Sequence, residues 1–405
     1  MSGILKEQAD IPVGTRFRVF PQYPGEPGFE EPAVIVLKPK PGTIGSGPDD
    51  GRLRVIDAVA KTRPYTGLEF PPYRGTVHAP VAPDPSGHFD RVNPSQREFK
   101  AVHAYACLRL VLDIWESYLG HPIHWLMQET FPQIEVIPRV EFPNAQASPG
   151  SIELGYALTE SGERRWFALS FDVLAHEMGH IILGAEVGIS GAHVSAEYIA
   201  FQESMADLIS LISVLHIESF TNHLLTATNG NLYAPNELNR LAELSPTSQI
   251  RSASHNITML DLPFRSLPRA RLTQSQLHLL GQPLTGALFD VLVEVFQQQL
   301  VEYGAIPEAL ARLSMQHGPT ADDLARIDRE FSSHYAVRPE YFHQALRFAR
   351  DFTAERLVRS WELLKPERLT LLSAAAAFLT ADRAISRERY QKLILECIQW
   401  RKIAA

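Results

Sequence analysis

The spacing of apolar residues changes character partway along the chain. Before residue 170, apolar residues alternate in short runs, which is typical of β-strands; the predicted strands are 15–20, 33–38, 53–60, 134–140 and 152–158. Apart from a helix over 99–120, the long helical periodicities come later, at 172–183, 195–216, 218–228, 236–244, 283–303, 306–315, 320–332, 338–364 and 366–400. This pattern predicts an α+β fold with a β-rich N-terminal half and a mainly helical C-terminal half.

A chain of 405 residues is long enough for two or three domains. We expect four segments: a β-rich region with an irregular arm (1–95), a half with an edge strand and a central helix (96–184), a helical half (185–335) and a helical extension (336–405). The arm, from 64 to 94, is rich in Pro and Gly. It either lies across a cleft as a built-in regulator or, as we favour, packs as an extension of the β region.

Composition narrows the class of protein. Hydrophobic residues make up 45% and charged residues 21% of the chain, as in globular proteins, and the net charge of −8 argues against a nucleic-acid partner. Without an apolar run of eighteen residues, no membrane span is expected. The first residues do not resemble a secretory signal, so we expect a cytoplasmic protein, with leaderless export left open. Cys107 and Cys397 are predicted to be buried free thiols, although one disulfide is possible. The pattern does not indicate an oligomeric state.

The residues with the clearest chemistry are His176, Glu177 and His180, which form an H-E-x-x-H pattern inside an apolar helix. Residues four apart share a helix face, so both imidazoles can bind one Zn²⁺, while Glu177 can reach a water without ligating the metal. We expect Gly184 to end this helix in the left-handed conformation. The alternative is a core helix whose two histidines have protein partners.

A third ligand decides between these interpretations. Glu203 and Asp207 lie one turn apart on the next apolar helix, so Glu203 can ligate the metal while Asp207 orients a ligand histidine. Glu186 is a second candidate ligand, and a solvated helix face is the alternative for Glu203. A metzincin pattern is excluded because Leu183 stands where it needs Gly and Glu186 where it needs His. His121 and His124 are interpreted as structural.

The spacing H-E-x-x-H, twenty-two residues, E-x-x-x-D resembles that of the gluzincins, and the flanking sequence over roughly residues 90–300 resembles the thermolysin-like zinc metallopeptidases. The resemblance implies a thermolysin-like catalytic unit with the zinc helix at the junction of its halves. It also implies a zinc-dependent endopeptidase with one Zn²⁺ held by His176, His180 and Glu203, Asp207 beside His176, and Glu177 as general base acting on a peptide or protein substrate.

The same resemblance assigns residues outside the metal ligands. Asn144 and Ala145 would bind the substrate backbone on an edge strand, Val173 would line an apolar pocket, Arg251 would bind a substrate carbonyl and His278 would stabilise the oxyanion. Arg240 competes with Arg251, whose alternative is a surface cation. The family pairs its histidine with an Asp about five residues earlier, where this chain has Thr273, so the alternative for His278 is a loop residue just before a helix starting at Pro283.

Calcium is not predicted, because Asp172 resembles a helix cap more than a calcium ligand. A second function class stays open. The chain could be a zinc-stabilised interaction or regulatory protein that keeps the fold with weak or no catalysis. Glu177 argues against this, since a structural site has no need of a general base, whereas the missing partner of His278 argues for it.

Overall fold

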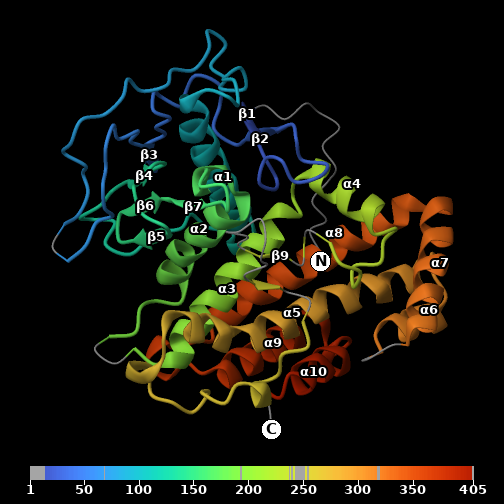
Figure 1. The fold of residues 1–405 in the computed structure, drawn as a ribbon. Coiled ribbons are helices and arrows are strands. Elements are labelled where there is room, and N and C mark those ends of the chain that lie inside the picture. The colour runs from blue at the N-terminus through green and yellow to red at the C-terminus, as the bar shows by residue number, and fades with distance from the viewer. Residues whose placement is uncertain are drawn as a thin grey trace. The chain divides into compact units, whose positions relative to one another are not determined.

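The computed structural model describes residues 14–67, 69–191, 194–236, 238, 240–241, 251–252, 255–316 and 320–403. The chain divides into two compact units, residues 1–113 with 127–171 and residues 114–126 with 172–405. Strands of the larger sheet belong to the first unit and most helices to the second, which confirms the predicted mixed composition (Figure 1). The four segments expected from the sequence remain a prediction, because the two units are defined by packing alone.

Unit 1 contains three small sheets and most of α1 (Arg97–Leu119). β1 (Thr15–Val19) pairs with β2 (Ala33–Leu37), and β7 (Tyr156–Leu158) pairs with β8 (Arg164–Trp166). The four-stranded sheet has the order β3 (Leu53–Val55), β4 (Ile134–Ile137), β6 (Ser151–Leu154), β5 (Ala145–Ser148), so β5 is an edge strand as predicted. The predicted strand 152–158 is divided at Gly155, where a side chain would collide with the carbonyl oxygen of Phe142.

The two faces of the four-stranded sheet differ in polarity. Ile134, Val136, Ile152 and Leu154 alternate onto one face and are buried in the core of unit 1. The register places Glu153 beside Ile137 of β4 and Gln146 of β5, so Glu135, Glu153 and Gln146 share the opposite face. Both glutamates are nevertheless buried. Buried carboxylates need partners, and the irregular arm supplies them.

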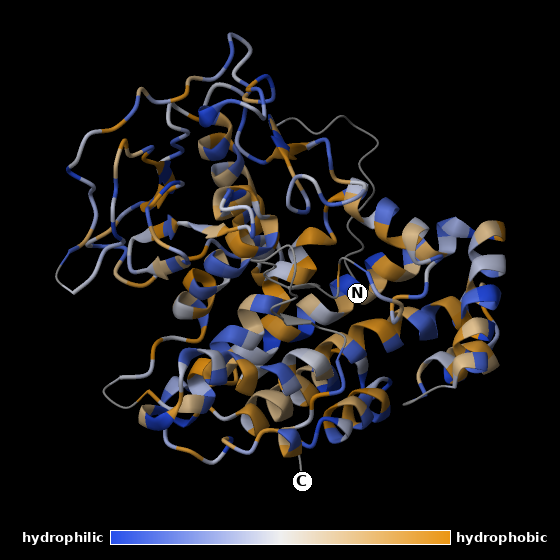
Figure 2. Cartoon of the chain, in the orientation of Figure 1, coloured by the Kyte–Doolittle hydropathy of each residue, from blue (hydrophilic) through white to orange (hydrophobic). Residues whose placement is uncertain are grey.

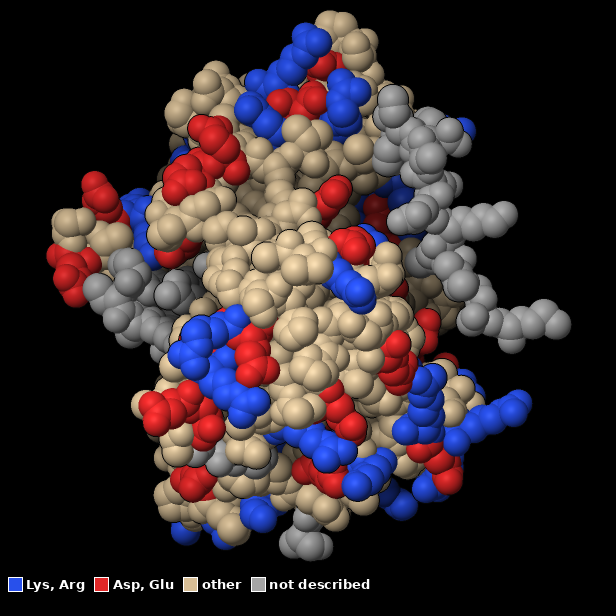
Figure 3. Space-filling model, turned by 90° about the vertical axis from the view of Figure 1, so that its right-hand side faces the viewer, with Lys and Arg blue, Asp and Glu red and all other residues tan. Residues whose placement is uncertain are grey.

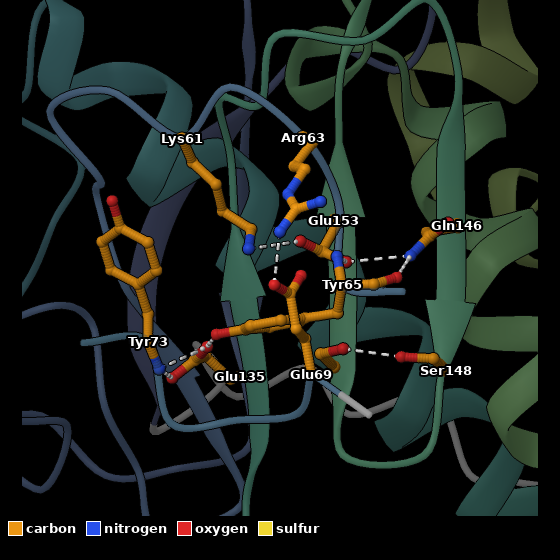
Figure 4. Close-up of polar contacts among 10 residues, drawn as sticks. Lys61, Arg63, Tyr65, Glu69, Tyr73, Glu135, Gln146, Ser148 and Glu153 are labelled. Atoms are coloured by element: carbon orange, nitrogen blue, oxygen red, sulfur yellow. Dashed lines mark hydrogen bonds and ion pairs between the residues drawn. The ribbon is translucent and has the colours of Figure 1, made fainter. Parts of the chain in front are cut away.

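The arm packs on the polar face of this sheet (Figure 4). The Lys61 ammonium lies 3.3 Å from Glu153 Oε1 and above the ring of Tyr65. The backbone N–H of Tyr65 donates to Glu153, while the Tyr65 hydroxyl and the Tyr73 N–H donate to Glu135. Burial raises the pKa of Glu153, and the contacts with Tyr65 and Lys61 oppose that rise. Residues 61–73 are therefore held as a packed extension of the β region.

Removing the buried ammonium should weaken this attachment. Lys61→Met leaves Glu153 buried without its counter-ion, so we expect the free energy of unfolding of unit 1 to fall by about 3 kcal/mol. Amide hydrogen exchange at Tyr65 and Tyr73 would report it locally. Arg63→Met is the matched control, because the Arg63–Glu69 pair is exposed and its loss should cost less than about 0.5 kcal/mol. Equal effects of the two substitutions would contradict this account.

Unit 2 is a helical assembly. It contains most of α2 (Phe171–Glu186), α3 (Ala196–Val214), α4 (Glu218–Ala227), α5 (Gln274–Glu302), α6 (Glu308–Ser314), α7 (Ala321–Val337), α8 (Pro339–Trp361), α9 (Leu371–Ser386) and α10 (Gln391–Trp400). α5 packs against α3, α8 and α10, and its buried residues face them on several sides. Figure 2 shows the apolar residues along these helices. A helix that is apolar nearly all round is stable only in such a core.

Several predicted helices are wrong in their limits. α5 begins nine residues before Pro283, because Thr273 and Gln276 form a capping box that starts it earlier. The predicted helix 366–400 is two helices, separated where Arg387 and Glu388 adopt left-handed φ values of 53° and 73°. The predicted helix 236–244 is contradicted at residues 240–241, which form β9 (Arg240–Leu241) paired with β10 (Arg251–Ser252); much of the rest lies outside the described residues.

Two further expectations concern membranes and thiols. Within the described residues, α5 is long and apolar enough to cross a membrane, but 89% of its apolar stretch is buried, as in the core helix of a folded protein. α3 and α4 together would pass the same test only as a broken span bent by 93°. No membrane span is therefore indicated. Cys107 and Cys397 are both buried free thiols, as predicted.

Unit 2 contains a buried ion pair between Asp290 of α5 and Arg401, which follows α10. Arg401 is 2% exposed and binds Asp290 through two nitrogens, at 3.0 and 2.7 Å. Gly286 makes room for the guanidinium, since a Cβ there would come within 2.7 Å of it. Burial raises the pKa of Asp290 to about 6 although Arg401 opposes it, and burial next to Asp290 raises the pKa of Glu294 to about 8. Glu294 therefore holds its proton at neutral pH.

This proton makes the folding stability of unit 2 depend on pH. Between the ordinary glutamate pKa and about 8, the folded chain binds a proton at Glu294 that the unfolded chain lacks, so stability falls as pH rises through this window. We expect Glu294 to contribute a loss on the order of 3 kcal/mol between pH 5 and pH 8.5, obtained as the difference between the unsubstituted chain and Glu294→Gln in urea unfolding followed through helical circular dichroism. Glu294→Gln should flatten the slope. An unchanged slope in that variant would contradict the assignment.

Candidate metal centre

α2 carries the H-E-x-x-H residues and is longer than predicted. It continues through Gly184 to Glu186, so the prediction that Gly184 ends it is wrong. Gly188 ends it instead. With φ +91° it takes the left-handed conformation, and its N–H donates to the Leu183 carbonyl at 3.3 Å. Glu186 faces His121 at 3.6 Å rather than the pair of histidines.

A close approach of α2 and α3 brings the predicted ligands together. A Cβ on Gly179 would lie 3.0 Å from the Cα and 3.2 Å from the Cβ of Ala206. Only glycine therefore lets the helices come this near without displacement. Ala206 stands between Glu203 and Asp207 on α3, and Gly179 stands between His176 and His180 on α2. The close contact between the helices therefore lies next to the candidate ligands of both α2 and α3.

The donor atoms of His176, His180 and Glu203 converge. The two histidine Nε2 atoms are 3.1 Å apart, and the Glu203 carboxylate oxygens lie 3.3 Å from His176 Nε2 and 3.9 Å from His180 Nε2. Ligands of one tetrahedral zinc ion, each about 2.0–2.2 Å from it, stand roughly 3.3–3.6 Å apart. This group could therefore hold a metal ion. His176 and Glu203 are buried, while the side chain of His180 is 24% exposed.

Asp207 sets the orientation of His176. Its Oδ1 lies 2.9 Å from His176 Nδ1, and both residues are buried. With the Nδ1 proton donated to Asp207, the neutral imidazole presents a lone pair on Nε2 to the Glu203 carboxylate. Two acceptors cannot face each other at 3.3 Å unless a proton or a cation lies between them. The donor set thus fits a metal cation.

The charge state of Glu203 agrees with this fit. Burial raises its pKa, but the contacts with His176 and His278, whose ring nitrogens donate when no metal is bound, and the nearby charge of His180 outweigh burial, so its pKa lies well below the usual range. An ionised carboxylate is the form that ligates a metal. Glu177, one residue after His176, is also buried. The cluster therefore joins two imidazoles to one ionised glutamate, with Glu177 adjacent to it in the sequence.

His278 belongs to the same site, although it is not a loop residue. It lies on the second turn of α5, with Nε2 3.2 Å from Glu203 Oε2 and 3.1 Å from Gln274 Nε2. Gly281, one turn further along α5, allows the approach to α3, since a Cβ there would come 2.5 Å from the Ala200 carbonyl oxygen. Thr273 caps α5, its side chain accepting the N–H of Gln276.

The other predicted site residues are not brought into this cluster by any described contact. Val173 is buried in the first turn of α2. Ala145 begins the edge strand β5 in unit 1, directly after Asn144. In the β9–β10 pair, Arg240 lies opposite Ser252 and Arg251 opposite Leu241, and the side chains of both arginines lie outside the described part of the chain. The substrate-binding roles of these residues remain predictions.

Sequence reasoning missed three positions that shape the site. Gly179 and Gly281 are glycines inside helices, which are destabilising without a packing reason, and that signal was available. Gln274, which contacts His278, was missed because α5 was expected to start at Pro283. The T-x-x-Q pattern of Thr273 and Gln276 is the signal that places Gln274 at the start of the helix.

Comparisons with known proteins add little at this point. No protein-family model and no curated protein matches the chain. Among solved structures it is similar to the precursor of protealysin, a metalloproteinase from Serratia proteamaculans, with 15% identity, 73% of this chain and 86% of that chain covered, and a TM-score of 0.38. A likeness this low carries no argument, and the site must be judged on its own geometry.

The glycine contact gives a direct test of that geometry. Gly179→Ala should push α2 from α3 by a few tenths of an ångström, spread the donor atoms and weaken zinc binding about tenfold, measured by competition with a chromophoric chelator. Gly184→Ala is the matched control on the same helix. Its Cβ would meet nothing within 4 Å, so zinc affinity should stay unchanged. Equal losses in both variants would contradict the proposed contact.

Proposed function

We propose that the chain is a zinc-dependent endopeptidase of the thermolysin-like kind. The observation that carries the proposal is the convergence of donor atoms of His176, His180 and Glu203 at 3.1–3.9 Å from one another, close to the edges of a zinc tetrahedron, with Asp207 on the far nitrogen of His176. The order of these residues along the chain, H-E-x-x-H followed by E-x-x-x-D, favours a peptidase over other kinds of metal-dependent hydrolase.

The proposal gives each residue of the site a role. His176, His180 and Glu203 would hold Zn²⁺, which supplies Lewis-acid polarisation of a peptide carbonyl and of a water molecule when bound. Glu177 takes a proton from the attacking water and returns it to the leaving amine. Asp207 keeps the proton of His176 on Nδ1. His278, on the rim of the cluster, donates a hydrogen bond to the developing oxyanion.

A substrate peptide also needs a surface to bind. Edge strands offer free N–H and C=O groups to an extended chain, and β5 is such a strand. We keep Asn144 and Ala145 as the proposed backbone-binding residues, Val173 as a proposed pocket residue and Arg251, with Arg240 as its competitor, as the proposed carbonyl ligand. The zinc-stabilised interaction protein is the competing function, and it gives Glu177 no role.

Substitution of the base separates the two functions. Glu177→Gln should retain zinc, because Glu177 is no ligand, and should lose peptide hydrolysis by about 10³-fold or more. Zinc content by mass spectrometry and cleavage of a peptide library, each with and without a chelator, measure both properties. Glu203→Gln is the companion variant, expected to lose zinc and hydrolysis together. Cleavage that persists in Glu177→Gln, or after complete zinc removal, would overturn the mechanism.

A further inference from the structure

A groove in unit 2 adjoins the candidate metal centre. It has a volume of about 950 Å³ and is bordered by the start of α3, the start of α5 and the segment 265–272 between them. Its lining residues are Val194, Ser195, Ala196, Glu197, Arg265, Ser266, Leu267, Pro268, Arg269, Ala270, Leu272, Gln274 and Leu277. A cavity of this volume accommodates several residues of an extended peptide.

Two contacts connect the groove to the site. Gln274 lines the groove and places its amide nitrogen 3.1 Å from His278 Nε2. That same histidine nitrogen lies 3.2 Å from Glu203 Oε2. Leu277, another lining residue, directly precedes His278. A chain bound in the groove would therefore lie beside the proposed catalytic residues.

The charged residues of the groove favour an anion. Arg265 and Arg269 are exposed, and within the described part of the chain neither forms an ion pair with a carboxylate. Arg265 uses one guanidinium nitrogen on the Leu262 carbonyl, which leaves the others for a ligand. Glu197 is the one acid in the lining, and its Oε2 already accepts the N–H of Leu371 at the start of α9.

The scaffold adds to this preference. α3 and α5 both present their first turns to the groove, and a helix N-terminus carries partial positive charge. On the face drawn in Figure 3, Lys and Arg are interspersed with Asp and Glu. In the groove, by contrast, the two lining arginines lie with a single acidic residue, Glu197.

We propose that this groove selects peptide substrates that carry a carboxylate, which Arg265 and Arg269 bind next to the metal centre. This inference rests on the proposed function and names its substrate class. Arginine suits the role because its planar guanidinium can bind a carboxylate through two parallel hydrogen bonds. The carboxylate can come from an acidic side chain or from the C-terminus of a short peptide.

Binding can be measured apart from cleavage in the zinc-treated full chain carrying Glu177→Gln. The probes are fluorescent decapeptides that differ only by Glu or Gln at one position, each with a free or an amidated C-terminus, followed by anisotropy. We expect each carboxylate-bearing form to bind about fivefold to tenfold tighter than its neutral partner at low salt, with the difference shrinking at 0.5 M salt. A preference that survives amidation identifies the side chain as the source, and one abolished by amidation identifies the C-terminus.

Arg269→Gln and Arg271→Gln form a matched pair on one 3-10 turn, Arg269–Arg271, of which only Arg269 lines the groove. Arg269→Gln should reduce the preference for the carboxylate about threefold, and the double variant with Arg265→Gln should abolish it, whereas Arg271→Gln should preserve it. Equal affinity for charged and neutral peptides in the unsubstituted groove, or equal losses at Arg269 and Arg271, would overturn the inference.

The two proposals fail differently. If the chain with Glu177 intact binds acidic peptides through Arg269 but cleaves none of them in the presence of zinc, the groove is confirmed and the peptidase function is wrong. If it cleaves peptides with no regard to their charge, the peptidase function stands and the groove inference is wrong.

Discussion

The structure of the site depends on how closely α2 and α3 approach. At Gly179 and Ala206 the two helices are too near for any side chain larger than hydrogen on the α2 side. This separation places the imidazoles of α2 within 3.9 Å of the carboxylate of Glu203. Burying such a set of acceptors is unfavourable for folding unless a cation neutralises it. The helical core therefore holds the ligands in position before any ion arrives, and preorganisation of this kind favours metal affinity over folding stability.

A second close contact extends the site to α5. Gly281 packs against the Ala200 carbonyl, and Thr285 donates a hydrogen bond to Ser204, the neighbour of Glu203. These contacts lie along the buried side of α3, so His278 is positioned by the same core that positions the ligands. The hydroxyl of Thr273, in turn, caps α5 and fixes where Gln274 begins the helix. Cap, glycine contact and histidine occupy consecutive turns of one helix, and together they connect the groove containing Arg265 and Arg269 to the cluster.

Much of this arrangement could be predicted from the sequence. The rest could not, because it depends on contacts between residues far apart in the chain. The four-residue spacing of His176 and His180 places them on one helix face. The helix that carries Glu203 and Asp207 is apolar on most sides, so both carboxylates must be buried with it. Local periodicity was therefore enough to predict the four residues of the cluster. The limits of α5 were wrong because proline was taken as a helix start, although it is tolerated inside a helix whose capping box lies upstream. The predicted end of α2 was wrong because the backbone stays helical at Gly184 and becomes left-handed only at Gly188. The packing of Lys61 on Glu153 depends on a contact ninety-two residues apart, which no local pattern encodes.

The central claim is that His176, His180 and Glu203 bind one zinc ion. Diffraction data collected just above and just below the zinc absorption edge, from crystals of the zinc-loaded chain, test it most directly. The account predicts one anomalous peak per chain, about 2.0–2.2 Å from both histidine Nε2 atoms and from a Glu203 oxygen. A peak elsewhere, or none at this position while Glu203 turns away from the histidines, would contradict it.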